Sequence, residues 1–198
     1  APLEYTNSIG FPLRDALAFV DDCLMGFGLR ENIKIIASGK IISAFQLAKN
    51  LSLGADLCNS ARGMMLALGC VQSLSCNTNK CPTGVATQDP RLARGLNVED
   101  KFERVYRFHQ KTVHALIDLL SSTGHKNTNE LNRTHIFKRI DQCNVARYDE
   151  MYPLIKKGAF LTDEIPERYK LHYEEANADS FMPSSLLAEI DKETKAVS

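Results

Sequence analysis

The chain has 198 residues, enough for one sizeable hydrophobic core with a smaller appendage. Lys+Arg and Asp+Glu balance at 24 each, which excludes a chain whose net charge attracts nucleic acid or an anionic membrane. No apolar run reaches the ~18 residues of a membrane-spanning helix. Six cysteines are too few for a disulfide-dense secreted scaffold, so we expect a reducing, cytosolic (cytoplasmic) compartment.

Helices and short strands alternate through the first 70 residues. After Pro12, "LRDALAFVDDCLMGFGLR" carries apolar residues at helical spacing and stops at Gly28. "IKIIASG" predicts a short buried parallel strand that ends at Gly39, and "ISAFQLAKNLSLGA" predicts a helix closed by Gly54. "DLCNSARG" predicts a second strand, which leads into the helical "MMLALG". This order is typical of βα units on a parallel sheet.

The two strands do not make a complete sheet. Parallel strands require neighbours on both edges and helices on both faces. We therefore expect the closing part of a larger α/β barrel, whose earlier strands precede Ala1. The opening "APLEYTNSIGFPLRDALAF", which has no initiator Met, also reads as a fragment of a longer protein.

The second half of the chain has a different character. "VEDKFERVYRFHQKTVHALIDLLSSTG" predicts a long amphipathic helix that ends at Gly124. "TNELNRTHIFKRI" contains a weak capping box for a further helix, with Asn129 as the cap. The remainder is polar and punctuated by proline, and about 15 terminal residues are expected to fray. We divide the chain into a barrel part at 1–98 and a helical C-terminal extension, partly disordered at its tail, at 99–198.

Each predicted strand ends in a turn of small residues that leads directly into a helix. These turns are "ASGKI" (37–41) and "NSARG" (59–63). Backbone N–H groups at such turns, together with the positive end of the helix dipole, can hold a phosphate, and Lys40 and Arg62 add positive charge. Two consecutive loops of this kind form the usual phosphate site of an α/β barrel. The alternative is that the glycines only punctuate tight turns and that both cations are solvated.

Three cysteines follow at C-x5-C-x4-C spacing, at Cys70, Cys76 and Cys81. They lie in a polar loop at 70–88 that contains "CPTG", and thiolates of this number suit a soft metal or an iron–sulfur cluster. A structural zinc site would need a fourth ligand, for which His109 and His114 are candidates. Buried thiols or a disulfide within the loop are further alternatives, and the spacing does not decide between them.

The run "FQLAKNLSLGADLCNSARGMMLALGCVQSLSCNTNKCPTGVATQDP", preceded by "IIASGKI", resembles the FMN-binding domain of the glutamate synthase family. The likeness extends over residues 1–108 and thins out beyond Gly124. It implies the last βα units of a (β/α)8 TIM barrel that carries FMN. The residues that match the family's two FMN-phosphate loops are Ser38, Gly39 and Lys40, and Ala61, Arg62 and Gly63. Arg62 departs from the Gly-Thr-Gly that glutamate synthases tend to have there.

The resemblance also assigns the cysteines and the reaction. Cys70, Cys76 and Cys81 match the family's three ligands to a [3Fe–4S] cluster. In that family, reduced flavin delivers hydride to 2-iminoglutarate, formed from 2-oxoglutarate and ammonia, and the product is L-glutamate. The implied partners are the missing N-terminal part of the barrel and an electron donor or a glutaminase. No catalytic acid or base is assigned, because Glu4 and Arg14 read as residues at the entry to a helix.

Two alternatives to this oxidoreductase remain open. The first is a non-catalytic assembly or binding module, in which exposed sheet edges pair in a swapped homodimer. The second is a zinc-stabilised interaction domain. We expect the fragment alone to be inactive, with Cys23, Cys58 and Cys143 as buried or free thiols.

Overall fold

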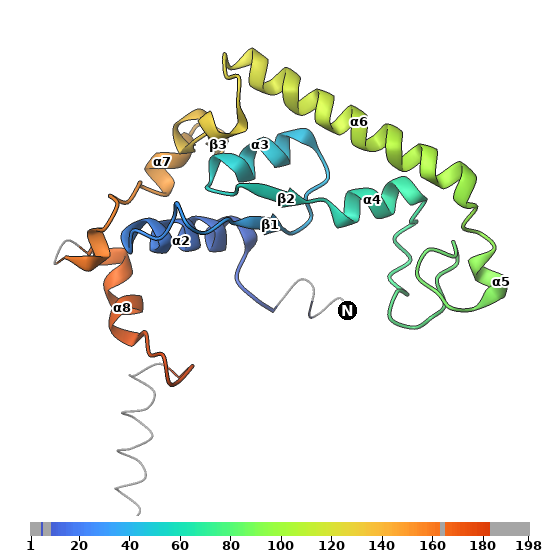
Figure 1. Cartoon of the computed structure of the whole chain (residues 1–198), viewed down its shortest axis with the longest axis horizontal. Helices are drawn as coiled ribbons and strands as arrows, with labels where there is room; N and C mark the ends of the chain where they lie inside the picture. Colours follow the sequence, from blue (N-terminus) through green and yellow to red (C-terminus); the bar gives the residue numbers. More distant parts are fainter. Residues whose placement is uncertain (1–4, 6–8, 163–164, 183–198) are drawn as a thin grey trace, which may run out of the picture.

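A computed structural model of the chain describes residues 5, 9–162 and 165–182. Helices and strands are mixed, which confirms the α/β class (Figure 1). Glu4 and the tail that was expected to fray lie outside the described residues. None of the described helices combines the length and the apolar character needed to cross a bilayer.

Two βα units form the centre of the molecule. The elements are α2 Leu13–Gly26, β1 Ile36–Ser38, α3 Ala44–Ser52, β2 Leu57–Asn59 and α4 Ala61–Leu68. β1 and β2 pair in parallel, with Ala37 opposite Cys58. Both predicted strands and the three predicted helices are therefore confirmed.

The β1–β2 sheet is covered on one face only. Ala37 and Cys58 pack into a core with Leu17 and Leu53 from the flanking helices. On the opposite face, Ile36 and Leu57 are 55% and 58% exposed. The prediction of a strand buried on both faces is therefore wrong for the described residues.

The predicted long helix is confirmed as α6 (Val98–Ser122), and the structure shows that it covers α3 and α4 (Figure 1). Its N-cap is Asn97, whose side chain accepts the N–H of Glu99. Between α4 and α6 the chain forms the cysteine loop and one short helix, α5 (Pro90–Ala93), at one end of the molecule.

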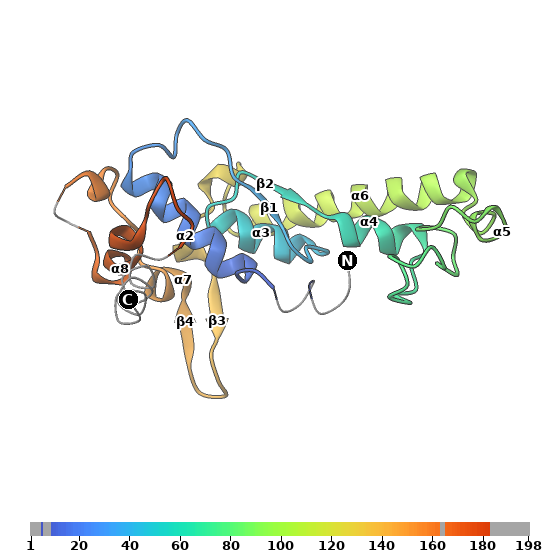
Figure 2. The same cartoon turned by 90° about the horizontal axis from the view of Figure 1, so that it is seen from below.

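The rest of the chain contains an antiparallel hairpin that the sequence did not predict. The elements are η1 Thr128–Glu130, η2 Arg133–His135, β3 Phe137–Arg139, β4 Val145–Arg147, α7 Tyr148–Met151, η3 Ala159–Leu161 and α8 Glu167–Glu175. β3 pairs with β4 and the hairpin projects from the body (Figure 2). The helix expected after Asn129 is wrong: Asn127 caps η1 and Asn132 caps η2, each a single 3₁₀ turn.

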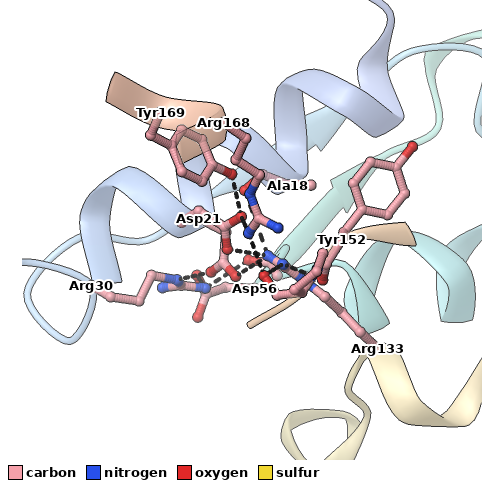
Figure 3. A network of polar contacts seen from close by, with 11 residues as sticks. Ala18, Asp21, Arg30, Asp56, Arg133, Tyr152, Arg168 and Tyr169 are labelled. Atoms are coloured by element: carbon pink, nitrogen blue, oxygen red, sulfur yellow. Dashed lines mark hydrogen bonds and ion pairs between the residues drawn. The ribbon is translucent and has the colours of Figure 1, made fainter. Parts of the chain in front are cut away.

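A network of ion pairs joins segments of the chain at the amino ends of β1 and β2 (Figure 3). Arg30 Nη2 lies 2.9 Å from Asp56 Oδ2, and Arg30 Nε lies 2.7 Å from Asp21 Oδ1. Asp56 also accepts the backbone N–H of Ile35, the residue before β1, at 2.9 Å. Asp56 therefore ties the starts of both strands to α2 through Arg30.

Arg133 extends this network to the C-terminal part of the chain. Its side chain is 1% exposed and lies 2.9 Å from Asp21 Oδ2 and 2.8 Å from Asp22 Oδ1. It also donates to the carbonyl of Tyr152 at 2.9 Å, and Asp22 accepts the Tyr169 hydroxyl (Figure 3). The segments around η2, α7 and α8 are thus joined to α2 by buried polar contacts.

Candidate functional site

A cavity of about 630 Å³ lies at the carboxyl ends of β1 and β2. It brings together the two loops that follow the strands and the first part of the cysteine loop. The lining residues are Ser38, Gly39, Lys40, Asn59, Ala61, Arg62, Met65, Leu66, Cys70, Gln72, Leu74 and Cys76. Of the residues that match the family's phosphate loops and cluster ligands, only Gly63 and Cys81 are absent from this lining.

A second cavity, of about 670 Å³, adjoins the first. It shares Ser38, Gly39, Lys40 and Arg62 with the first, and its other wall is formed by residues 9–13 and Ala16. Lys40 and Arg62 therefore lie between two cavities. No carboxylate in the described ranges forms an ion pair with Arg62, so its charge is available to an anion.

The backbone is strained at this end of the sheet. Among the described residues other than glycine, positive φ angles occur at Lys40 (54°), Gln72 (56°), Leu74 (60°) and Asn79 (62°). The first three line the cavity and the fourth lies in the cysteine loop. Left-handed conformations in non-glycine residues are unfavourable and tend to gather at ligand sites.

The helices that follow the two strands start differently. In α3, Ser43 Oγ accepts the N–H of Gln46, whose side chain accepts the N–H of Ser43 in return, a complete capping box. In α4, Ser60 occupies the N-cap position but its side chain caps no N–H group. Its Oγ instead donates to the carbonyl of Ile41, 2.8 Å away in the first loop. The first turn of α4 thus has no side-chain cap.

Gly39 and Gly63 are in close contact with neighbouring helices. A Cβ at Gly39 would lie 3.0 Å from the side chain of Leu13 in α2. A Cβ at Gly63 would lie 2.4 Å from Ser60 Oγ and 3.0 Å from Cζ of Phe108 in α6. Gly63 therefore serves close packing of α4 on α6 rather than direct contact with the cavity.

The three cysteines of the loop differ in their surroundings. Cys70 and Cys76 line the cavity, and the N–H of Gln72 donates to Cys70 Sγ at 3.4 Å. Cys81 is buried, with Sγ 3.5 Å from the Thr83 hydroxyl. That hydroxyl and the N–H of Ala86 lower the pKa of the Cys81 thiol to about 7. Hydrogen-bond donors directed at sulfur are typical of thiolates.

The described residues do not gather three or more His, Cys, Asp or Glu side chains into a metal-binding group. The three thiols are thus not assembled into a ligand set, and neither is a set that would include His109 or His114. All six cysteines are free thiols. Of the other three, Cys143 is exposed, Cys23 is half-buried, and burial raises the pKa of half-buried Cys58 to about 11.

The second half of the cysteine loop is fixed by backbone packing. Gly84, in the "CPTG" turn, has φ +77°, and a Cβ there would lie 2.4 Å from the carbonyl oxygen of Leu92 in α5. The Asn79 side chain accepts the N–H of Gln88 at 2.6 Å, which joins the two ends of this turn. The turn that carries Cys81 is therefore held against α5.

Comparison with known proteins identifies the family. Residues 1–126, well over half of the chain, match the family described as the conserved region in glutamate synthase. The chain belongs to the glutamate synthase family. The matched region contains both strand-end loops, the cysteine loop and all of α6, so every residue of the candidate site lies within it.

Relatives of this glutamate synthase family member include bacterial, archaeal and eukaryotic proteins. The glutamate synthase large subunit-like protein YerD of Bacillus subtilis is 38% identical over 148 residues, which cover 75% of this chain and 28% of YerD. The archaeal glutamate synthase (NADPH) of Methanocaldococcus jannaschii is 37% identical over 124 residues, 63% of this chain and 24% of that protein. The chain thus spans about a quarter of the length of these relatives.

The sequence analysis did not select five of the residues that line the cavity. They are Asn59, Met65, Leu66, Gln72 and Leu74. Asn59 ends β2, and its position at a strand end was a usable signal. Met65 and Leu66 looked like an ordinary apolar helix face, and the left-handed backbone of Gln72 and Leu74 had no sequence signal.

Proposed function

We propose that this chain supplies the FMN-phosphate end and the iron–sulfur loop of a glutamate synthase-type oxidoreductase built on a (β/α)8 TIM barrel. One observation carries the proposal: a single cavity is lined by both strand-end loops and by Cys70 and Cys76. In this fold, ligands bind at the carboxyl ends of the strands, and the last two loops hold a phosphate. Family membership supports the same assignment.

The anionic end of the flavin would be held by backbone and charge. The uncapped first turn of α4 offers N–H groups at Ala61, Arg62 and Gly63, at the positive end of the helix dipole. Ser38, Gly39 and Lys40 form the facing loop. The Lys40 and Arg62 side chains lie beside the same volume and would add charge-assisted hydrogen bonds.

The cysteine loop would hold the [3Fe–4S] cluster through Cys70, Cys76 and Cys81. The donor chemistry fits, because Cys70 and Cys81 already accept hydrogen bonds from loop groups that would support thiolates. The three sulfurs are not gathered in the described residues, so binding must draw them together. Coupling of this kind is common, because a preformed ligand set is rare without its metal.

When bound, FMN and the cluster supply hydride and electron transfer, and the protein positions them. We propose 2-oxoglutarate and ammonia as substrates, as the family resemblance implies, and L-glutamate as product, which agrees with the relatives' name, glutamate synthase. Electrons or ammonia would come from a donor protein or a glutaminase. Ile36 and Leu57, exposed on one sheet face, would face the barrel interior once further strands complete it. The chain alone is expected to be inactive.

Anaerobic purification of the protein in its natural full-length form tests the proposal. We expect flavin absorbance, a broad cluster absorbance and protein-bound iron. Cys76→Ser should remove the iron and keep the flavin, whereas Cys143→Ser, a matched change at an exposed cysteine outside the loop, should keep both. Colourless, iron-free wild-type protein would contradict the proposal.

A second candidate, an assembly module, is favoured by the open edges of the two-stranded β1–β2 sheet. Two copies would then complete one another's sheets in a homodimer. Sedimentation velocity over a hundredfold range of concentration distinguishes the candidates. A monomer at every concentration eliminates the homodimer.

A further inference from the structure

We infer that Ser60 is a positioning residue that sets the spacing of the two loops at the cavity and keeps the first turn of α4 open to an anion. The inference rests on the proposed function, because it concerns the same anion site. It assigns a role to a residue that does not line the cavity itself.

Ser60 occupies a position where serine normally caps a helix. An N-cap serine usually accepts an N–H from the second or third residue of the helix, as Ser43 does in α3. Ser60 makes no such bond, and its hydroxyl donates to the Ile41 carbonyl at 2.8 Å. The Ser60 hydroxyl therefore does not occupy the N–H groups of α4, and it joins the two loops instead.

The acceptor of this bond is a fixed point. Ile41 is 2% exposed, and its side chain belongs to the central core. It directly follows Lys40, whose φ of 54° reverses the chain at the cavity. Because packing holds Ile41 in place, its hydrogen bond with Ser60 fixes the start of α4 relative to the first loop.

The Ser60 hydroxyl occupies space that is free only because residue 63 is glycine. A Cβ on Gly63 would lie 2.4 Å from Ser60 Oγ, so any larger residue would displace the hydroxyl from the Ile41 carbonyl. The half-buried ring of Phe108 in α6 lies 3.0 Å from the same Cβ position. A side chain at position 63 would therefore meet both the Ser60 hydroxyl and helix α6.

The test compares Ser60→Ala with Ser43→Ala, the same substitution at the N-caps of consecutive helices. FMN and riboflavin differ only in the phosphate, so the ratio of their affinities isolates the anion site. We expect Ser60→Ala to lower FMN affinity about five- to tenfold, as loss of one hydrogen bond predicts, and to leave riboflavin affinity unchanged. Ser43→Ala should lower the stability of the protein while the affinity ratio stays the same.

Amide hydrogen exchange gives a readout that does not depend on flavin. Ser60→Ala should accelerate exchange at 38–43, because the loop loses its tie to α4. Unchanged exchange there overturns the role of Ser60, whatever the flavin result. Accelerated exchange in a protein whose wild type binds FMN no better than riboflavin leaves the Ser60 bond standing and overturns the phosphate site instead.

Ser60→Asp separates positioning from stability. Aspartate is a strong N-cap that would accept the α4 N–H groups but cannot donate to the Ile41 carbonyl. We expect FMN affinity to fall by more than in Ser60→Ala, although the unfolding midpoint is maintained or raised. FMN affinity equal to that of the wild type would overturn the inference.

Discussion

The two ends of the β1–β2 pair are held by different kinds of interaction. At the amino end, buried and half-buried charges are paired: Arg30 with Asp21 and Asp56, and Arg133 with Asp21 and Asp22 (Figure 3). At the carboxyl end, the described residues include left-handed non-glycine positions and a helix, α4, that has no side-chain N-cap. At the amino end the charged side chains are paired within the chain, whereas the first turn of α4 at the carboxyl end has no side-chain cap.

The proposed function accounts for this difference. A buried charge is tolerated only when it is paired and hydrogen-bonded, so a network such as that of Arg133 fixes the relative positions of the segments that it joins. An anion site requires unsatisfied donors held in place by the surrounding backbone. In α/β barrels, the fold proposed for the intact protein, residues at the amino ends of the strands serve stability and residues at the carboxyl ends serve chemistry.

The largest expected effect comes from removing the centre of the charged network. Arg133→Met keeps much of the side-chain volume but leaves Asp21 and Asp22 without their shared partner. Breaking a buried ion pair by removing one member destabilises a protein by about 3–5 kcal/mol. Urea unfolding followed by circular dichroism measures this loss.

The matched control is Arg139→Met in β3. Arg139 is exposed and donates to the Gln142 carbonyl in its own hairpin. Its loss should change the free energy of unfolding by no more than about 0.5 kcal/mol. Similar losses in the two variants would mean that the amino-end network does not hold the fold.

The second prediction tests whether the carboxyl end is held by backbone shape. Gly84 and Gly158 have φ angles of +77° and +79°, so alanine at either site has the same strained conformation, at about 1 kcal/mol. A Cβ at Gly84 would also lie 2.4 Å from the Leu92 carbonyl oxygen, whereas nothing lies within 4 Å at Gly158. We therefore expect Gly84→Ala to destabilise by about 1–3 kcal/mol more than Gly158→Ala in urea unfolding. Equal losses would show that the "CPTG" turn can move away from α5 freely.

Local signals in the sequence predicted the elements around the site. Helical spacing of apolar residues and a closing glycine located α2, α3 and α6, and short β-branched runs located β1 and β2. The strand and helix positions also located the loops that contain Lys40 and Arg62, and in the structure both residues line one cavity. These features depend on neighbours within a few residues, which a single sequence contains.

Contacts between distant segments had no such signal. Arg133 looked like one more polar residue, and its burial depends on Asp21, 112 residues earlier. Ser43 and Ser60 each directly precede a helix, and only the position of the Ile41 carbonyl separates their roles. The β3–β4 hairpin has strands of three residues with charged side chains, too short for an alternating pattern to emerge.

The smallest expected effect is a pH dependence in the turn that carries Arg133. His135 Nδ1 accepts the N–H of Asn132 at 3.1 Å, which requires that nitrogen to be unprotonated. Burial, and then the neighbouring ring of His125 at 4.4 Å, lower the pKa of His135 below its usual 6.5. Among the charged groups on adjoining elements, Arg147 pairs with Asp149, and Glu130 and Glu150 accept backbone N–H groups.

The sign follows from the lowered pKa. Neutral His135 stabilises the fold fully above about pH 6.5, and this contribution is lost as pH falls through the lower folded-state pKa. We expect a loss of about 0.5–1 kcal/mol, the worth of one helix cap, between pH 7.5 and pH 5. In His135→Gln the amide oxygen can accept the same N–H without titrating. The difference in unfolding free energy between wild type and this variant should therefore change with pH. A constant difference would mean that protonation of His135 does not affect the stability of the fold.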